Sequence, residues 1–246
     1  MDFRKLVFGV LVALASVACG GSEPGDDPNP SGTGGGGGGG GGPAKLGNLL
    51  PWKEGNTWTY RVTDDAGVST VKRTIIGGVE PVGGTGPNKD RMANKVTTQK
   101  DDTGGAVDLD ETVSWRAVEG ERVVRYREQA FGRTTNQLEL EEHWDAHKLH
   151  VDSSAEKTTP GATWLESYKE TKLPAGGTPV YDVPVNDRWF ADRIESVTVP
   201  AGTFEALVLR KVSAAGAAKT YWYAPGIGKI KETGGQTEEL MEYELK

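Results

Sequence analysis

The chain has 246 residues, a net charge of −7 and one cysteine, and 26% of its residues are charged against 36% hydrophobic. An acidic chain of mixed charge is not a nucleic-acid binder, and charge alone would not draw it to anionic lipid. A single cysteine excludes an intramolecular disulfide.

Residues 1–18 have the pattern of a secretory signal peptide. Arg4 and Lys5 precede the apolar run Leu6–Ala18, which ends in small residues. This run of 13 residues is shorter than the ~20 residues that a helix needs to cross about 30 Å of hydrocarbon. We therefore expect residues 1–18 to be removed on export, with an uncleaved membrane anchor as the alternative.

Ser16-Val17-Ala18-Cys19 resembles the lipobox of bacterial lipoproteins. In that family the cysteine becomes the first residue of the mature protein and carries acyl chains such as palmitate. The resemblance implies lipidation of Cys19, and several acyl chains hold a protein stably on a membrane. Ser16 departs from the leucine of the best matches. Gly20, rather than aspartate, follows the cysteine and favours the outer membrane of the cell envelope.

Residues 19–45 are expected to form a disordered linker behind the lipidated cysteine. Gly34–Gly42 is an unbroken run of nine glycines. Glycine loses the most backbone entropy on ordering, and this segment has no apolar side chains whose burial would offset that loss. A Gly-rich coil of this length has a root-mean-square span of about 25–30 Å. The linker would let a folded domain stand away from the bilayer.

Residues 46–246 are expected to fold as an all-β, mainly antiparallel domain. Apolar and polar residues alternate in stretches such as NTWTYRV, VSTVKRTII and ALVLRKV, and Gly, Pro, Asp and Asn clusters separate these stretches. This pattern is typical of antiparallel strands joined by hairpins. Pro225-Gly226 suits the centre of a type II turn, and Pro200 to Gly202 predicts a second tight reversal. The Gly-free stretch 134–160 is the best candidate for a helix.

A short sequence motif occurs twice in the domain. Gly55-x-Thr57-Trp58 and Gly161-x-Thr163-Trp164 both open a predicted strand. One interpretation is a duplication into halves 46–150 and 151–246. The other is that a glycine turn followed by Thr-Trp is simply a good hairpin element, and the sequence leaves both open.

The segments LLPWKEGNTWTYRV, PGATW, VTVPAGTF and YWYAPGIGKIKE resemble a family of bacterial secreted lipoproteins of unassigned function. The closing pair, VPAGTF with YWYAPGIG, carries most of this resemblance. Such domains are similar to the half-open β-barrels of periplasmic lipoprotein carriers. The resemblance implies a curved sheet or half-open barrel whose concave face is open to an apolar ligand, and it supplies no catalytic residues.

Seven tryptophans are available for either the core or a ligand groove. Aromatic residues line many ligand pockets. Tryptophan on a strand nevertheless more often belongs to the core, and we expect that of most of these residues.

The three histidines, His143, His147 and His150, all lie in HWDAHKLH. On a helix they would share one face and form a candidate zinc or copper site. On a strand His150 would point away from the other two. We favour a strand, a turn at Asp145-Ala146 and a second strand, which would make these surface histidines around a hairpin and leave them only weak metal candidates.

No other motif indicates catalysis or a cofactor. The sequence lacks a Gly-x-Ser-x-Gly elbow, and its glycine run lacks the Gly-Lys-Ser/Thr of a phosphate loop. We therefore expect a non-enzymatic, membrane-anchored lipoprotein that binds an apolar ligand or a partner protein of the envelope. The alternatives are a structural envelope protein without a pocket and a weak metal binder at the three histidines.

Overall fold

The computed structural model describes residues 46–102, 109–132 and 135–246. The predicted signal peptide 1–18, the lipidation site Cys19 and the linker 19–45 lie outside these residues. Among the residues that are described, no helix has the length and apolarity needed to cross a membrane.

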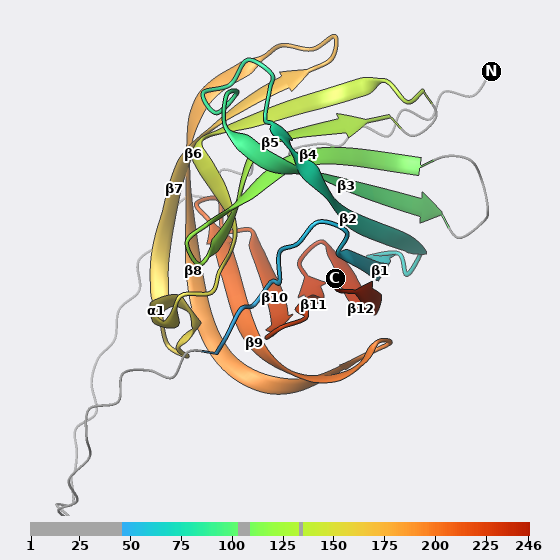
Figure 1. Ribbon diagram of the computed structural model, residues 1–246, viewed down its shortest axis with the longest axis vertical. Helices are drawn as coiled ribbons and strands as arrows, with labels where there is room; N and C mark the ends of the chain where they lie inside the picture. Colours follow the sequence, from blue (N-terminus) through green and yellow to red (C-terminus); the bar gives the residue numbers. More distant parts are fainter. Residues whose placement is uncertain (1–45, 103–108, 133–134) are drawn as a thin grey trace, which may run out of the picture. The chain divides into compact units, whose positions relative to one another are not determined.

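Within these ranges, twelve antiparallel strands account for nearly all the regular structure (Figure 1). They are β1 (Thr57–Asp64), β2 (Ser69–Pro81), β3 (Met92–Asp102), β4 (Leu109–Glu119), β5 (Arg122–Phe131), β6 (Leu138–Asp152), β7 (Thr163–Pro174), β8 (Val180–Val199), β9 (Gly202–Ser213), β10 (Ala218–Ala224), β11 (Gly228–Thr233) and β12 (Gln236–Glu244). One short helix, α1 (Ala155–Thr158), joins β6 to β7. The predicted all-β, antiparallel fold class is confirmed.

The strands form a barrel in chain order, and the barrel is closed because the first strand pairs with the last. β1 lies antiparallel to β12 from Thr57 opposite Glu244 to Asp64 opposite Gln236. Closure removes the free strand edges that a half-open sheet would leave available for pairing with other chains. The sequence predicts a curved sheet or a half-open barrel, whereas the strands of the structure form a closed barrel.

Several local predictions are confirmed. Ile227 N donates to Ala224 O at 3.0 Å around Pro225-Gly226, and Gly226 has φ of +77°. This is the positive φ that a type II turn requires at its third position. Val199 pairs with Gly202 at the β8–β9 reversal. Both copies of the repeated motif begin a strand, β1 and β7, and in each copy the glycine, Gly55 or Gly161, has a positive φ.

The predicted helix over 134–160 is wrong: in its described part, 135–160, most residues belong to strand β6, and the helical residues are those of the single turn α1. The predicted strand, turn and strand around Asp145-Ala146 is also wrong, because β6 runs from Leu138 to Asp152 without reversing. Its pairing with β5 jumps from Arg127 opposite His143 to Arg125 opposite Lys148. The extra residues of β6 form a bulge, which interrupts the alternation in the way that a turn does.

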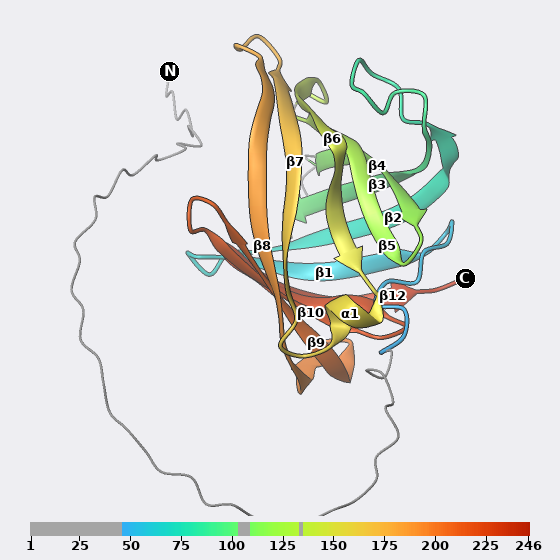
Figure 2. The same cartoon turned by 90° about the vertical axis from the view of Figure 1, so that its left-hand side faces the viewer.

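β6 and β7 pair along only part of their length. Leu140–Asp145 are hydrogen-bonded to Lys169–Pro174, and the registered pairs end there. Beyond that point Glu166 of β7 bridges the gap, since its carboxylate accepts from Leu149 N at 2.5 Å and from Trp189 Nε1 at 2.7 Å. Figure 2 shows β6 leaning away from β7 and β8, which continue together as a long hairpin.

The segment 46–56 crosses one end of the barrel (Figure 1). Asn48 O accepts from Gly226 N at 2.7 Å, Leu49 N donates to Ser153 Oγ at 3.0 Å, and Trp52 Nε1 donates to Asn94 Oδ1 at 2.9 Å. Leu49 and Leu50 belong to the main hydrophobic cluster. The packed core therefore gathers around this segment and leaves room elsewhere inside the barrel.

Four of the seven tryptophans are buried, as expected for core residues: Trp58, Trp115, Trp144 and Trp189. The other three, Trp52, Trp164 and Trp222, are partly buried and pack against the main cluster.

Candidate functional site

A cavity of about 500 Å³ lies inside the barrel. Residues from every strand except β7 line it, together with Leu50 and Trp52 of the crossing segment. Ligand pockets in proteins commonly measure ~300–1,000 Å³. The cavity is thus large enough for a small molecule and is shaped by almost the whole barrel.

Most of the charged side chains in the lining are positive. Eight lysines and arginines line the cavity against three glutamates, although the chain as a whole carries a net charge of −7. The cations are Lys72, Lys100, Arg116, Arg125, Lys148, Lys211, Lys219 and Lys229, and the glutamates are Glu128, Glu232 and Glu238. The lining therefore carries these charges beside apolar and aromatic side chains such as Leu50 and Trp58, whereas the family resemblance implies an apolar concave face.

The wall formed by β2, β10, β11 and β12 contains a neutralised network of ions, which we call the paired wall: Lys72, Lys219, Lys229, Glu232 and Glu238. Lys229 Nζ lies 2.7 Å from Glu238 and is also paired with Glu232, while Lys219 Nζ lies 2.8 Å from Glu232. Lys72 is the second partner of Glu238. Both glutamates are buried.

Burial and neighbouring charge compete in the paired wall. Burial raises the pKa of Glu238, but the charges of Lys229 and Lys72 outweigh it and hold that pKa well below its usual range. Burial lowers the pKa of Lys72 to about 8, with the like charge of Lys229 as the second cause. Burial also lowers the pKa of Lys229, but Glu232 and Glu238 more than reverse this and leave it well above its ordinary value.

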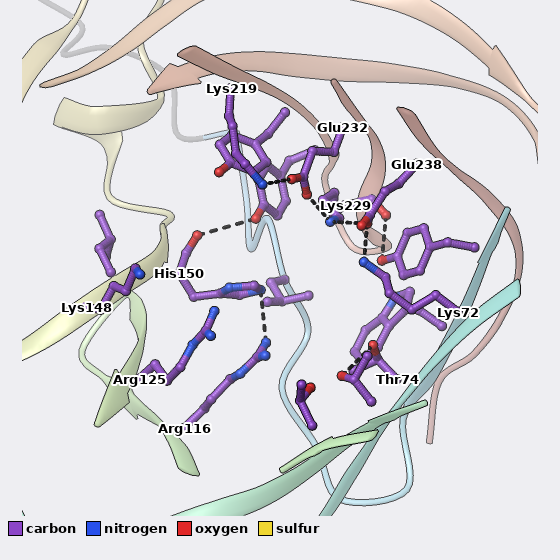
Figure 3. A pocket seen from close by; sticks show the side chains of 18 of the residues that line it. Lys72, Thr74, Arg116, Arg125, Lys148, His150, Lys219, Lys229, Glu232 and Glu238 are labelled. Atoms are coloured by element: carbon purple, nitrogen blue, oxygen red, sulfur yellow. Dashed lines mark hydrogen bonds and ion pairs between the residues drawn. The ribbon is translucent and has the colours of Figure 1, made fainter. Parts of the chain in front are cut away.

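The opposite wall carries three cations side by side, which we call the cationic row: Arg116, Arg125 and Lys148. Arg116 of β4 is the direct partner of Arg125 on β5, and Arg125 is the direct partner of Lys148 on β6. Directly opposed residues in antiparallel strands point to the same face. Figure 3 shows Arg116 and Arg125 on the other side of the cavity from Glu232 and Glu238.

Arg116 is 8% exposed, and its hydrogen-bonding and cross-strand neighbours among the described side chains are uncharged or also basic. Its Nε donates to Ser114 Oγ at 2.8 Å, and its guanidinium approaches His150 Nε2 at 3.5 Å. Within the described ranges, no carboxylate lies within ion-pair distance of it. Burial, followed by the like charge of Arg125, lowers the pKa of Arg116 to about 9.

Arg125 and Lys148, the other two members of the row, have acidic partners that use only part of their capacity for hydrogen bonds and ion pairs. Arg125 pairs with Glu128, but its buried Nε has no hydrogen-bond partner among the residues that the structure describes. Lys148 is 3.8 Å from Glu170, which it shares with Lys172. Burial lowers the pKa of Lys148, and the like charge of Arg125 adds to this effect.

An aromatic stack borders the cavity next to these charges. The rings of Trp189 and Tyr221 are 5.7 Å apart and inclined at 25°, and Tyr223 lies 6.4 Å from Tyr221. All three side chains line the cavity. The site therefore combines charged groups with flat apolar faces.

The structure places the three histidines in separate surroundings. His143 is 4% exposed, and its Nε2 bonds to Glu141 Oε1 at 2.7 Å. His147 Nδ1 lies 3.6 Å from Glu119 Oε2, and His150 lines the cavity beside Arg116. The expected surface position is wrong for His143 and His150. No group of three or more metal-ligating side chains occurs in the part of the chain that is described.

The cationic row has no signal in the sequence pattern. Ser114, Trp115 and Arg116 are all buried, and the β4–β5 register shifts between Trp115 and Arg116. A second shift separates Arg125 from Arg127 on β5. Because the alternation fails at these bulges, the parity of the flanking residues does not reveal which arginines face inward.

No protein-family model matches the sequence, and no curated protein matches it. One similar solved structure is a Bacteroides fragilis protein provisionally described as exported, with a YmcC-like fold; it is 13% identical, with a TM-score of 0.47, over 80% of this chain and 98% of that chain. Another, from Parabacteroides distasonis, is provisionally described as a lipoprotein; it is 12% identical, with a TM-score of 0.45, over 80% and 99%. Similarity at this level assigns no ligand, reaction or site to the chain.

Proposed function

We propose that the protein is a non-enzymatic, lipid-anchored binding protein of the cell envelope that holds a small molecule inside its barrel. The observation that carries the proposal is the cavity of about 500 Å³, lined from eleven of the twelve strands. A purely structural barrel gains most stability from a filled interior, because close packing adds dispersion contacts. A cavity of this size with charged side chains in its lining is better explained by ligand binding.

The lining changes the class of ligand that we favour. An apolar molecule would have to cover eight lysine and arginine side chains that line the cavity. Burying charge against an apolar surface is costly. We therefore favour a polar ligand over the apolar one expected from the sequence, with binding of an envelope protein as the alternative.

The location is proposed from the sequence. The apolar run Leu6–Ala18 ends at Cys19, the chain's single cysteine, and Gly20 follows it. This arrangement supports export, lipidation of Cys19 and residence at the outer membrane. The linker 19–45 would then connect the lipid to the barrel.

Native mass spectrometry of the full chain, purified from its own host without chelator, tests the binding function. We expect a small molecule to co-purify with the wild-type protein. Thr74→Trp should displace it, because Thr74 lines the cavity beside Thr98, with 3.1 Å between their hydroxyl oxygens. Arg73→Trp is the matched control, since Arg73 is exposed on the same strand. A bare mass for the wild type, together with no capture from host extract, would favour a structural role.

A further inference from the structure

The cationic row places like charges directly beside one another on three neighbouring strands. Arg116 opposes Arg125, and Arg125 opposes Lys148. Like charges in direct cross-strand positions destabilise a sheet. The paired wall avoids this cost by placing glutamates between its lysines, whereas the ion-pair partners of the row, among the side chains that the structure describes, are Glu128 and the shared Glu170.

Arg116 is the member of the row whose environment differs most from that of an ordinary buried cation. Buried charges in proteins are normally paired, because removing an ion from water is costly. Arg116 is 8% exposed, and its two hydrogen-bonding neighbours are the uncharged hydroxyl of Ser114 and the ring of His150. A guanidinium has five N–H donors in a planar fork. The two bonds leave several of these donors available on the side that lines the cavity.

The neighbouring groups add to this donor set. Arg125 Nε is buried without a hydrogen-bond partner in the described ranges, and Lys148 lies next along the row. Figure 3 shows the Arg116 and Arg125 side chains next to each other, with His150 above them. Two arginine forks and an ammonium group on one wall match the geometry of an oxyanion, which accepts two hydrogen bonds from each fork.

We infer that the cationic row binds an oxyanion group of the ligand, a carboxylate or a phosphate, at Arg116 and Arg125. This inference rests on the proposed binding function. Lys148 adds a third positive charge, and the body of the ligand lies toward the aromatic stack that contains Tyr221. The paired wall does not compete for the oxyanion, because Glu232 and Glu238 already neutralise most of its charge.

Isothermal titration calorimetry on the full-length protein at low ionic strength tests this inference. The probes are inorganic phosphate, succinate and glycerol, in a buffer free of other oxyanions. We expect phosphate or succinate to bind and glycerol not to bind. Arg116→Met should weaken the binding at least about tenfold, as expected for losing charge-assisted hydrogen bonds. Raising the salt concentration should weaken it further.

Arg188→Met is the matched control, because it makes the same change of charge at an exposed position outside the lining. It should leave the affinity unchanged. If Arg116→Met fails to fold by circular dichroism, Lys148→Met takes its place and should also weaken binding. Equal affinities in wild type and the row variants would overturn the inference.

The outcomes separate the inference from the function on which it rests. A neutral molecule that co-purifies in the cavity, with no binding of either anion, overturns the oxyanion site and leaves the binding function standing. A bare mass and no binding of any probe overturn both. A co-purified acid that Arg116→Met loses and Arg188→Met retains supports both and identifies whether the group is a carboxylate or a phosphate.

Discussion

At the scale of single residues, buried charge is arranged differently on the two walls of the cavity. Glu238 is 2% exposed and lies between Lys72 and Lys229, so each charge in the paired wall has an opposite neighbour. Arg116, at 8% exposed, has a hydroxyl and an imidazole instead. The first arrangement stabilises the folded chain. The second has an electrostatic cost that a bound anion would relieve.

Glu238→Gln should destabilise the protein by about 3 kcal/mol at neutral pH, because it leaves buried lysines with fewer partners. The folded pKa of Glu238 is depressed, so its contribution is fully present above the unfolded pKa of ~4.3 and is lost as pH falls below it. Urea denaturation at several pH values should show the gap to wild type closing below about pH 4.

Glu239→Gln serves as the control for that experiment. Glu239 is the next residue on β12, is partly exposed and pairs with Arg61 at 2.6 Å. A pair near the surface contributes roughly 0–1 kcal/mol. If Glu238→Gln and Glu239→Gln lowered the free energy of unfolding equally, the ion pairs of the paired wall would not be a special source of stability.

His150 should make the protein less stable as pH falls from 7 to 5. Burial and the positive charges of Arg116, Arg125, Lys229 and Lys72 hold the pKa of His150 well below its ordinary value. The unfolded chain then takes up the proton first, which favours unfolding below about pH 6.5. His150→Gln should remove up to about 2 kcal/mol of this loss in matched denaturation curves. If the difference in unfolding free energy between wild type and His150→Gln did not change with pH, the lowered pKa of His150 would be contradicted.

At the scale of elements, the region from β4 to β7 departs from regular pairing. Register shifts occur between Trp115 and Arg116 and between Arg125 and Arg127. The registered pairing of β6 with β7 stops at Asp145, opposite Lys169. These irregularities turn charged side chains into the cavity and leave a stretch where one side chain, Glu166, replaces backbone hydrogen bonds between the strands.

Glu166→Leu should destabilise the barrel by about 2–4 kcal/mol, because it leaves the Leu149 amide and the Trp189 indole N–H without their acceptor. Hydrogen exchange should speed up at the Leu149 amide more than at amides of β1. Glu205→Leu, at an exposed position of β9, is the control and should have little effect. Unchanged exchange at Leu149 would mean that Glu166 does not hold β6 to β7.

Regular elements were predictable from the sequence and irregular ones were not. NTWTYRV became β1, and Pro225-Gly226 became the β10–β11 turn, because period two and turn chemistry are local properties. The turn predicted in HWDAHKLH is a bulge within one continuous strand, and the two cannot be told apart from the sequence because both interrupt the alternation. The row of Arg116, Arg125 and Lys148 depends on register between strands, which no local pattern encodes.

At the scale of the whole molecule, an acidic chain encloses a basic cavity. The chain has a net charge of −7, whereas the lining has an excess of five positive charges. The excess of negative charge therefore lies outside the lining and keeps the barrel from anionic membranes, while the interior attracts anions. We propose that a lipid at Cys19, and not the surface of the barrel, provides the attachment to the membrane.

Cys19→Ala should release the protein from membranes. Several acyl chains are needed for stable anchoring, and a chain with a net charge of −7 is not drawn to anionic lipid by its charge. Fractionation of cells should move most of the protein from the membrane pellet to the soluble fraction. Ser22→Ala, which changes a nearby small residue of the linker, should leave the protein in the pellet. A Cys19→Ala variant that still sediments with membranes would contradict the lipoprotein assignment.

The most direct test of the binding account is the stability of Arg116→Met, measured by thermal unfolding with and without phosphate. If Arg116 is retained for a ligand, removing its buried and unpaired charge should leave the ligand-free protein as stable as wild type or more stable. Phosphate should then raise the Tm of wild type and not that of the variant. A variant that loses about 2 kcal/mol or more, and whose Tm still rises with phosphate, would show that Arg116 serves the fold instead.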